Sequence, residues 1–223
     1  MIVVAAATLG IASLSILGFG QKDKEQHASP ATPAGQKSIV IGGGCFWCLD
    51  GMYRQLRGVT NVESGYAGGN RPNLNYEQVC SGTTGAAEVV KLTYDPNVVS
   101  ASDLLHIFFT VHNPTTKNQQ GGDIGEQYRS VIFYENDEQL KLAKEVLADV
   151  EREKIWSDPI VTTLEPLKNY TRAEEYHQDY YNKFEKASAA EKMSMNAGYC
   201  SAIIQPKVIK FRQKYADRLK KGS

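Results

Sequence analysis

The chain has 223 residues, of which 42% are apolar and 22% charged, and this composition excludes a disordered chain, a collagen-like repeat and a polytopic membrane protein. Lys and Arg together number 25, as do Asp and Glu, so the formal net charge is zero. Because a general nucleic-acid binder needs an excess of cations for phosphate contacts, we expect no nucleic-acid partner.

The N-terminal segment predicts export from the cytoplasm. Residues 2–19 carry no charged side chain, and a helix of that length would span about 27 Å, close to the hydrocarbon thickness of a bilayer. We therefore assign residues 1–20 to a signal peptide or a membrane anchor, with Gly18 and Gly20 as a small-x-small cleavage pattern. The basic residues that usually begin such a segment are missing. The expected location is the periplasm, or the outer face of a membrane to which the N-terminus is anchored.

The rest of the chain predicts a linker followed by one domain. Residues 21–37 combine charges and small residues with Pro30 and Pro33, which is typical of a linker. Residues 38–220 are enough for a single domain that closes its own core.

Strand and helix patterns alternate from residue 38 onward. In chain order we expect a strand at 38–41, a helix at 45–57, a strand at 86–94, a helix at 103–111, a strand at 128–134, a helix at 138–150, a strand at 161–164, and helices at 174–184 and 207–220. This mixed order, without an internal repeat, predicts an α+β fold. We expect a single-domain two-layer α/β sandwich with a mixed sheet and long irregular segments.

The most informative stretch is a cysteine pair that follows three glycines, residues 42–44. The glycines allow a tight turn and the close approach of a ligand to the backbone. Cys45 falls in the first turn of the helix expected at 45–57, where the positive end of the helix dipole favours thiolate over thiol. Cys48 lies on the same helical face, within reach for a disulfide. The pair therefore predicts a redox nucleophile with a resolving thiol.

Three other interpretations of the cysteine pair remain open at this point: buried inert thiols, a zinc site and a thioredoxin-type dithiol. Zinc is disfavoured because Cys80 and Cys200 stand alone, without a second close pair, so we predict no metal. A thioredoxin-type motif usually has Trp before the first cysteine and Gly-Pro between the two. Here Phe46 and Trp47 fill the middle of the motif, which suggests an apolar pocket beside the nucleophile.

The motif Gly-Cys-Phe-Trp-Cys at residues 44–48 resembles the active-site signature of the peptide methionine sulfoxide reductase A family. The resemblance covers nearly everything from residue 38 to about residue 214, through the motifs at 65–69, 75–82, 84–90, 125–130, 176–178 and 199–200. Two departures stand out, because the family usually has His at the position of Ala86 and Asn at the position of Gly122. Residues 38–220 are then the catalytic domain of a methionine sulfoxide reductase.

Reduction of a sulfoxide needs a thiolate that attacks sulfur and a proton donor for the oxygen. Cys45 is the candidate nucleophile. Glu88 shares a strand face with Val90 and Leu92, whereas Lys91 marks the opposite face as wet. We therefore expect Glu88 in an apolar setting that raises its pKa and keeps a proton available. The resemblance likewise makes Glu88 the catalytic acid.

The remaining substrate contacts are implied by the resemblance alone. Tyr76 and Tyr128 match the family's two hydroxyl donors to the sulfoxide oxygen, and Asp123 matches the residue that binds the substrate main chain and a site water. Phe46 and Trp47 would hold the substrate methyl group. The implied substrates are the S epimer of methionine sulfoxide, free and in oxidised proteins.

The resemblance also implies that Cys45 becomes a sulfenic acid, that a second thiol condenses with it, and that thioredoxin or a similar thiol donor reduces the disulfide without a bound cofactor. Cys48 is favoured as the first resolving thiol because it is near in sequence, with Cys200 as the alternative or relay. Cys80 is expected to be a buried structural thiol, and His112 and His177 are left unassigned. We expect a monomer.

Two other functions compete with this hypothesis. A general thiol-disulfide oxidoreductase would use Cys45 and Cys48, but it has no need for Glu88 and the two tyrosines. A surface-anchored binding module would use the leader as a tether, but it does not explain a cysteine pair at a glycine-rich helix entry.

Overall fold

The computed structural model of the protein describes residues 29–222. The leader expected at residues 1–20 and the first part of the linker at 21–37 lie outside the described residues. Within residues 29–222, no helix combines the length and the apolar character that a membrane span requires.

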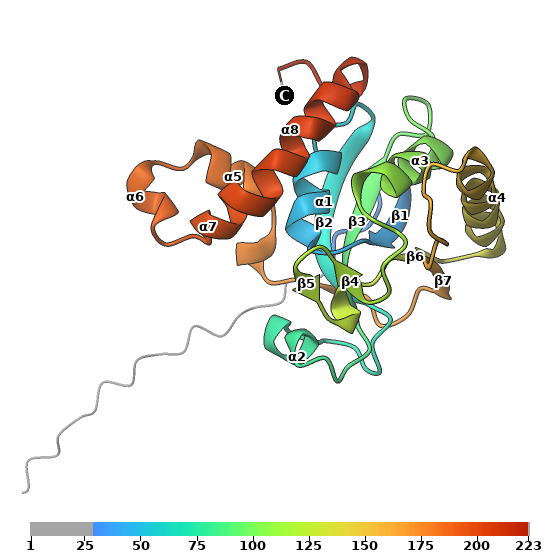
Figure 1. Cartoon of the computed structure of the whole chain (residues 1–223), viewed down its shortest axis with the longest axis horizontal. Coiled ribbons are helices and arrows are strands. Elements are labelled where there is room, and N and C mark those ends of the chain that lie inside the picture. Colours follow the sequence, from blue (N-terminus) through green and yellow to red (C-terminus); the bar gives the residue numbers. More distant parts are fainter. Residues whose placement is uncertain (1–28, 223) are drawn as a thin grey trace, which may run out of the picture.

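A six-stranded mixed sheet organises the domain, with strand order β7-β6-β1-β3-β2-β8 (Figure 1). All neighbours are antiparallel except β6 and β7, which run parallel. The strands are β1 (Lys37–Gly42), β2 (Val59–Ala67), β3 (Ala87–Tyr94), β6 (Val131–Tyr134), β7 (Thr163–Pro166) and β8 (Thr171–Arg172). A separate two-stranded hairpin, β4 (Gln119–Gln120) and β5 (Asp123–Ile124), lies at the same end of the molecule as α2 (Figure 1).

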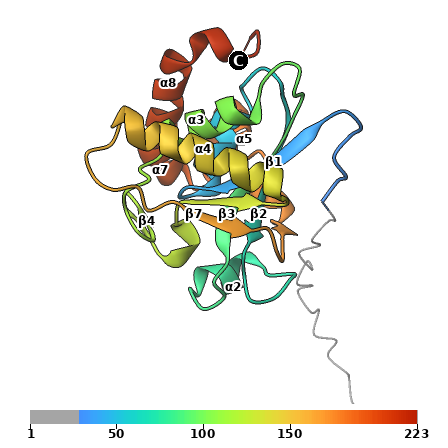
Figure 2. The ribbon, with the colours of Figure 1, turned by 90° about the vertical axis from the view of Figure 1, so that its right-hand side faces the viewer.

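Helices cover one face of this sheet, and Figure 2 shows α3 and α4 lying on that side. The helices are α1 (Phe46–Tyr53), α2 (Tyr76–Cys80), α3 (Ala101–Val111), α4 (Asp137–Glu153), α5 (Tyr180–Lys186), α6 (Ala189–Lys192), α7 (Ala197–Tyr199) and α8 (Gln205–Lys214). Short 3₁₀ turns span Glu126–Tyr128, Glu175–His177 and Ala216–Arg218, and a π-helical turn, Cys200–Ile204, joins α7 to α8.

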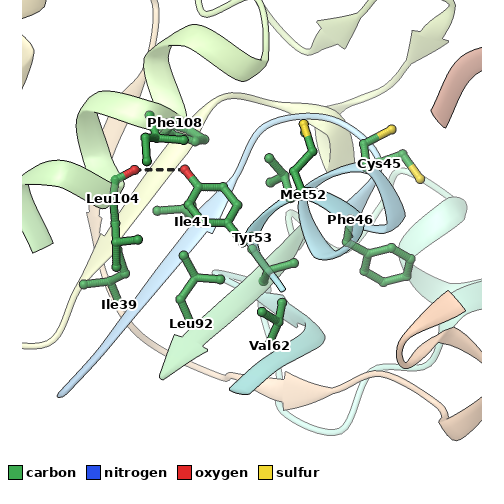
Figure 3. Packing of buried hydrophobic residues seen from close by; sticks show 14 of the residues in the cluster. Ile39, Ile41, Cys45, Phe46, Met52, Tyr53, Val62, Leu92, Leu104 and Phe108 are labelled. Carbon is green, nitrogen blue, oxygen red and sulfur yellow. Dashed lines mark hydrogen bonds between the residues drawn. The ribbon is translucent and has the colours of Figure 1, made fainter. Parts of the chain in front are cut away.

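The main hydrophobic core lies between the sheet and the helices. Ile39, Ile41 and Leu92 of the sheet pack against α1 and α3 (Figure 3). A smaller cluster, built from alternate residues such as Val40 and Val89, occupies the other sheet face and packs against loop residues. One helical layer on one sheet confirms the expected two-layer α/β fold.

The glycine-rich turn between β1 and α1 is required by packing against neighbouring side chains. Gly44 has a φ of 91°, a conformation that favours glycine. A Cβ atom at Gly43 would lie 2.9 Å from the ring of Phe108 and 3.0 Å from that of His112. The glycines therefore permit a close approach of the turn to the side chains of the core.

The expected elements are present, with three breaks that the patterns did not predict. The helix expected at 207–220 ends at Lys214, and the 3₁₀ turn Ala216–Arg218 follows it. The segment 174–184 is not one helix, because Asp179 has a φ of 53° and separates the 3₁₀ turn Glu175–His177 from α5. The segment 128–134 begins with Tyr128 in a 3₁₀ turn, and only Val131–Tyr134 is strand.

The expectation of a wet sheet face opposite Glu88 was wrong. Glu88 does share the helix-covered face with Val90 and Leu92, but Val89 on the other face is also fully buried. Lys91 is half-buried, and its ammonium group lies 5.7 Å from the ring centre of Tyr170. The aliphatic part of the Lys91 side chain therefore lies on a sheet face that is itself covered by other residues.

We predict that Tyr53→Phe lowers the free energy of unfolding by about 1 kcal/mol, because the fully buried Tyr53 hydroxyl donates a 2.9 Å hydrogen bond to the Leu104 carbonyl and ties α1 to α3 (Figure 3). Urea unfolding measures the change. Tyr134→Phe is the matched control, since no hydrogen bond of the Tyr134 hydroxyl occurs within residues 29–222. Equal stability of the two variants would contradict the prediction.

Candidate active site

A cavity of about 210 Å³ opens at the N-terminal end of α1. Segments that are far apart in the sequence converge on it: the β1–α1 turn, α2, β3, β5, the 3₁₀ turn before β6 and the segment around α7. Seven of the side chains predicted from the sequence line this cavity, together with two that were not predicted. These nine residues are Cys45, Phe46, Trp47, Tyr76, Glu88, Asp123, Tyr128, Asn196 and Tyr199.

Cys45 is the N-cap residue of α1, one position before the first turn in which it was expected. Its side chain is buried, with 8% of the residue exposed. Burial raises the pKa of Cys45 well above its ordinary value, and the contact with Cys48 adds to this. The expectation that the helix dipole makes Cys45 a thiolate was therefore wrong, because the loss of hydration outweighs the helix end. Burial therefore favours the thiol form of Cys45.

Glu88 lies beside Cys45 at the start of α1. The backbone N–H of Phe46 donates a 3.1 Å hydrogen bond to the Glu88 carboxyl, and only 2% of the residue is exposed. Burial raises the pKa of Glu88 well above its ordinary value, and negative charge on Cys45 or Asp123 raises it further. The surroundings of Glu88 therefore favour its acid form, in the environment that the strand pattern predicts.

Tyr76 and Tyr128 reach the cavity from different elements. Tyr76 is the first residue of α2, and Tyr128 ends the 3₁₀ turn before β6. Both rings are half-buried, and burial raises the pKa of each hydroxyl above its ordinary value. Both hydroxyls therefore keep their protons. The Tyr128 hydroxyl can donate a hydrogen bond to an oxygen bound in the cavity, whereas the Tyr76 hydroxyl contacts the Cys80 thiol and would have to turn from it to do the same.

Glu174 holds Tyr76 in place, and sequence reasoning missed it. This residue is 1% exposed, and its two carboxylate oxygens accept hydrogen bonds at 2.9 Å from the Tyr76 backbone N–H and the Tyr66 hydroxyl. In the sequence, Glu174 stands next to another Glu and gives no sign of burial. Its proximity to the family motif at residues 176–178 was the only available signal.

Asp123 is paired with a tyrosine from the C-terminal part of the chain. The Tyr199 hydroxyl donates a 2.7 Å hydrogen bond to the Asp123 carboxylate. Tyr199 also contacts Cys45, so this side chain lies between Asp123 and the Cys45 thiol. Tyr199 was known from the sequence only as part of a family motif, and it was not assigned to the site.

Aromatic rings form the apolar wall of the cavity. Trp47 stacks on Tyr180 with the ring centres 3.8 Å apart and the planes 6° from parallel. Phe46 is buried and packs against His177 at 4.9 Å between ring centres. His177 also lies 4.7 Å from the ring of Tyr76, so it braces the wall that these side chains form.

The other three cysteines occupy different environments. Cys48 is buried, and the Lys207 ammonium group donates a 3.8 Å hydrogen bond to its sulfur. Cys200 is fully buried in the π-helical turn, and burial raises its pKa to about 11. Cys80 is exposed at the end of α2, so the expectation of a buried structural thiol was wrong. All four cysteines are free thiols.

Comparison with known proteins decides the family. A family model described as peptide methionine sulfoxide reductase matches residues 37–219. The chain belongs to this family. Its relatives include a peptide methionine sulfoxide reductase MsrA from Polynucleobacter asymbioticus, which is 51% identical over 79% of this chain and 87% of the relative.

Solved structures give the same assignment. Mxr1 from Saccharomyces cerevisiae in reduced form matches with a TM-score of 0.65 and 38% identity, over 70% of this chain and 90% of Mxr1. Mxr1 in complex with Trx2 matches with a TM-score of 0.50 and 28% identity, over 69% of this chain and 92% of Mxr1. The protein is thus a thiol-dependent oxidoreductase that acts on methionine sulfoxide, and the alternatives of a disulfide exchanger and a binding module are wrong.

The two positions at which this reductase departs from the family lie outside the cavity lining. Ala86 is buried and is the residue before β3. Gly122 lies on the surface between β4 and β5, and nothing would contact a side chain there. Within residues 29–222, no group of His, Cys, Asp or Glu side chains is arranged to hold a metal ion.

We predict that Glu174→Gln lowers kcat/KM of this reductase about tenfold, because an amide has one acceptor oxygen and cannot serve both the Tyr76 N–H and the Tyr66 hydroxyl. Steady-state kinetics with a methionine sulfoxide peptide measures the change. Glu175→Gln is the matched control, since the neighbouring Glu175 carboxylate is largely exposed and forms an ion pair with Arg172. A loss shared equally by both variants would show that Glu174 has no positioning role.

Proposed function

We propose that this enzyme reduces the S epimer of methionine sulfoxide, free and in oxidised proteins, with Cys45 as the nucleophile and Glu88 as the acid. One observation carries the proposal: a buried thiol and a buried carboxyl, each with a raised pKa, line one cavity together with two tyrosines. A disulfide exchanger has no use for that acid, whereas the oxygen of a sulfoxide must be protonated before it can leave sulfur.

The proposed chemical step transfers oxygen from the substrate to Cys45. Glu88 donates its proton to the sulfoxide oxygen while Tyr76 and Tyr128 donate hydrogen bonds to it. The Cys45 sulfur forms a bond to the protonated oxygen, and the thiol proton of Cys45 passes to the Glu88 carboxylate and restores its acid form. The sulfur–oxygen bond of the substrate breaks, methionine leaves, and Cys45 remains as a sulfenic acid. The substrate gains the two electrons that Cys45 loses.

The walls of the cavity suit the two ends of the substrate. Phe46 and Trp47 present an apolar surface that fits the S-methyl group, because burying a methyl group against aromatic carbon is favourable. Asp123, held by Tyr199, presents a carboxylate oxygen that can accept a hydrogen bond from a main-chain N–H or bind a water. We expect the reactive epimer to be the one that places its methyl group against Phe46 and Trp47 while its oxygen points toward Glu88.

An assay with each pure epimer tests the function. The oxidation of NADPH is followed with thioredoxin, thioredoxin reductase and a peptide that contains one epimer of methionine sulfoxide. We expect turnover of the S epimer and none of the R epimer. Turnover of both, or of the R epimer alone, would overturn the substrate assignment.

We further propose that Cys48 is the first resolving thiol and that thioredoxin or a similar donor then reduces the disulfide. Cys48 already contacts Cys45, and closing so short a loop costs little chain entropy. Cys200 lies in a packed π-helical turn and would have to leave the core first. The complex of the similar protein Mxr1 with Trx2 supports a thioredoxin donor.

We predict that Glu88→Gln slows methionine release in a single turnover by roughly a hundredfold, because Gln keeps the hydrogen bond from Phe46 and loses the transferable proton. The wild-type rate should fall as the pH rises through the raised pKa of Glu88, and the variant should lack this alkaline fall. Rapid-quench measurement across the pH range checks both. Identical profiles would mean that Glu88 is only structural.

The same variant should lose less stability than wild type when the pH rises from 5 to 8. Folding holds Glu88 in its acid form, whereas the unfolded chain ionises it above its ordinary pKa, so the stability from Glu88 is present at low pH and is lost as the pH rises. Gln does not ionise and escapes this loss. Urea unfolding at pH 5 and pH 8 should show wild type weakening more than Glu88→Gln, and a parallel response would contradict the buried acid.

We predict that Cys48→Ser completes one turnover but is reduced slowly or not at all by thioredoxin. Cys200→Ser should form a disulfide between Cys45 and Cys48 that mass spectrometry detects after one equivalent of substrate. If only Cys200→Ser stalls, and no such bridge forms, Cys200 is the resolving thiol and the proximity argument fails.

We also propose that residues 1–20 direct the enzyme out of the cytoplasm, as a cleaved signal or a membrane anchor, and that the catalytic domain acts there as a monomer. The uncharged run at residues 2–19 supports this location. Cell fractionation of the full-length protein, with a variant that starts at Lys37 as control, measures the effect. Full-length protein found wholly in the cytosolic fraction would contradict export.

A further inference from the structure

The side chain of Lys207, on the C-terminal helix α8, contacts the sulfur of Cys48. Lys207 lies in the first turn of α8, and its ammonium nitrogen is 3.8 Å from the Cys48 sulfur. The next residue, Val208, is fully buried and Phe211 is 3% exposed, so α8 is anchored in the core where it passes α1 (Figure 1). The contact therefore joins two packed helices and does not depend on a free surface side chain.

The charge of Lys207 is directed at the thiol and not at a carboxylate. Among residues 29–222, the ion pairs do not include Lys207. His112 also faces this ammonium group, but burial lowers the pKa of His112 to about 4, so its ring is neutral and does not repel the lysine. A half-buried ammonium beside a buried sulfur favours the thiolate form of that sulfur.

The other groups that face Cys48 act in both directions. The contact with Cys45 lowers the pKa of Cys48 most, burial raises it, and Lys207 lowers it again. The charge of Asp123 raises the pKa of Cys48. Tyr199, which also lies near Cys48, donates a hydrogen bond to the Asp123 carboxylate. The net direction is downward for Cys48, whereas it is upward for Cys45.

We propose that Lys207 is a catalytic residue of the resolving step, where its ammonium group stabilises the Cys48 thiolate that attacks the sulfenic acid of Cys45. The sulfur–sulfur bond forms and the sulfur–oxygen bond of Cys45 breaks. The departing hydroxide takes the proton that Cys48 released and leaves as water. Cys48 is oxidised and Cys45 is reduced, so no further reductant is needed. This inference rests on the proposed role of Cys48.

The position of Lys207 separates this step from sulfoxide reduction. Lys207 does not line the cavity that holds Cys45, Glu88 and the tyrosines. Its removal should therefore act after methionine release, and sulfenic acid should accumulate on Cys45.

The test uses the full-length protein with Lys207→Met, which keeps the apolar stem, and Lys207→Arg, which keeps the charge. Lys210→Met removes an exposed lysine one turn further along α8 and is the matched control. One equivalent of the S-sulfoxide peptide is added without external thiol, at a series of pH values. Methionine release, capture of sulfenic acid by dimedone, and the disulfide between Cys45 and Cys48 are measured in each sample.

At pH 7, disulfide formation in Lys207→Met should be about tenfold slower relative to methionine release than in wild type, with sulfenic acid captured in the interval. A thiol with a higher pKa is less ionised but more nucleophilic once ionised, so the deficit should disappear at high pH. Lys207→Arg and Lys210→Met should behave like wild type. A Lys207→Met profile that matches wild type, or one slowed equally at every pH, would overturn the inference.

The same experiment distinguishes an error about the role of Cys48 from an error about the role of Lys207. If wild type itself forms no disulfide between Cys45 and Cys48, the role of Cys48 is wrong and the inference falls with it. If that disulfide forms in wild type and Lys207→Met makes it with the same pH profile, only the role of Lys207 is wrong.

Discussion

The structure depends on burying a carboxyl and a thiol side by side, with Glu88 2% and Cys45 8% exposed. Glu88 sits on the helix-covered face of β3, and the first N–H of α1 donates a hydrogen bond to it. That contact fixes the start of α1, and hence Cys45, against the sheet. Burying an ionisable group without a counter-charge is costly, and the carboxyl responds by keeping its proton. The surrounding core stabilises the arrangement that the reaction needs.

The two neighbouring cysteines have the same side chain but different surroundings, and these shift their pKa values in opposite directions. Cys45 opens onto the cavity and is held as a thiol beside a proton donor, whereas Cys48 lies behind it beside an ammonium group. The first environment suits an attack that is coupled to proton transfer, and the second suits a thiolate that waits for a sulfenic acid. Although the two side chains are in contact and only three positions apart, their surroundings differ, because Cys45 lines the cavity and Cys48 lies beside Lys207 of α8.

The sequence was sufficient for the fold class and for most of the cavity lining. Periodicity located β3 and α1, and the alternation along β3 put Glu88 on the same face as Val90 and Leu92. The break at Asp179 was not predictable, because a left-handed residue inside a helical pattern depends on tertiary contacts. Glu174 and Tyr199 were missed for a related reason, since their roles depend on partners about 100 and 76 positions away in the sequence.

The predicted thiolate form of Cys45 was wrong because the sequence does not show how deeply the sulfur is buried. A helix N-terminus lowers a thiol pKa, but the size of the opposing burial effect depends on how many segments close over the sulfur. Here Tyr76 of α2, Asp123 of β5 and Tyr199 of α7 line the cavity beside Cys45. The same enclosure acts on Glu88, for which burial was predicted, so one physical effect accounts for one failure and one success.

The protonation of Glu88 at neutral pH is the central claim of this account, and infrared difference spectroscopy tests it directly. The spectrum of Glu88→Gln is subtracted from that of wild type at pH 7. The account predicts the carbonyl band of a protonated carboxylic acid in the wild-type enzyme, and this band should fade as the pH is raised. A difference spectrum that contains only carboxylate bands at pH 7 would contradict it.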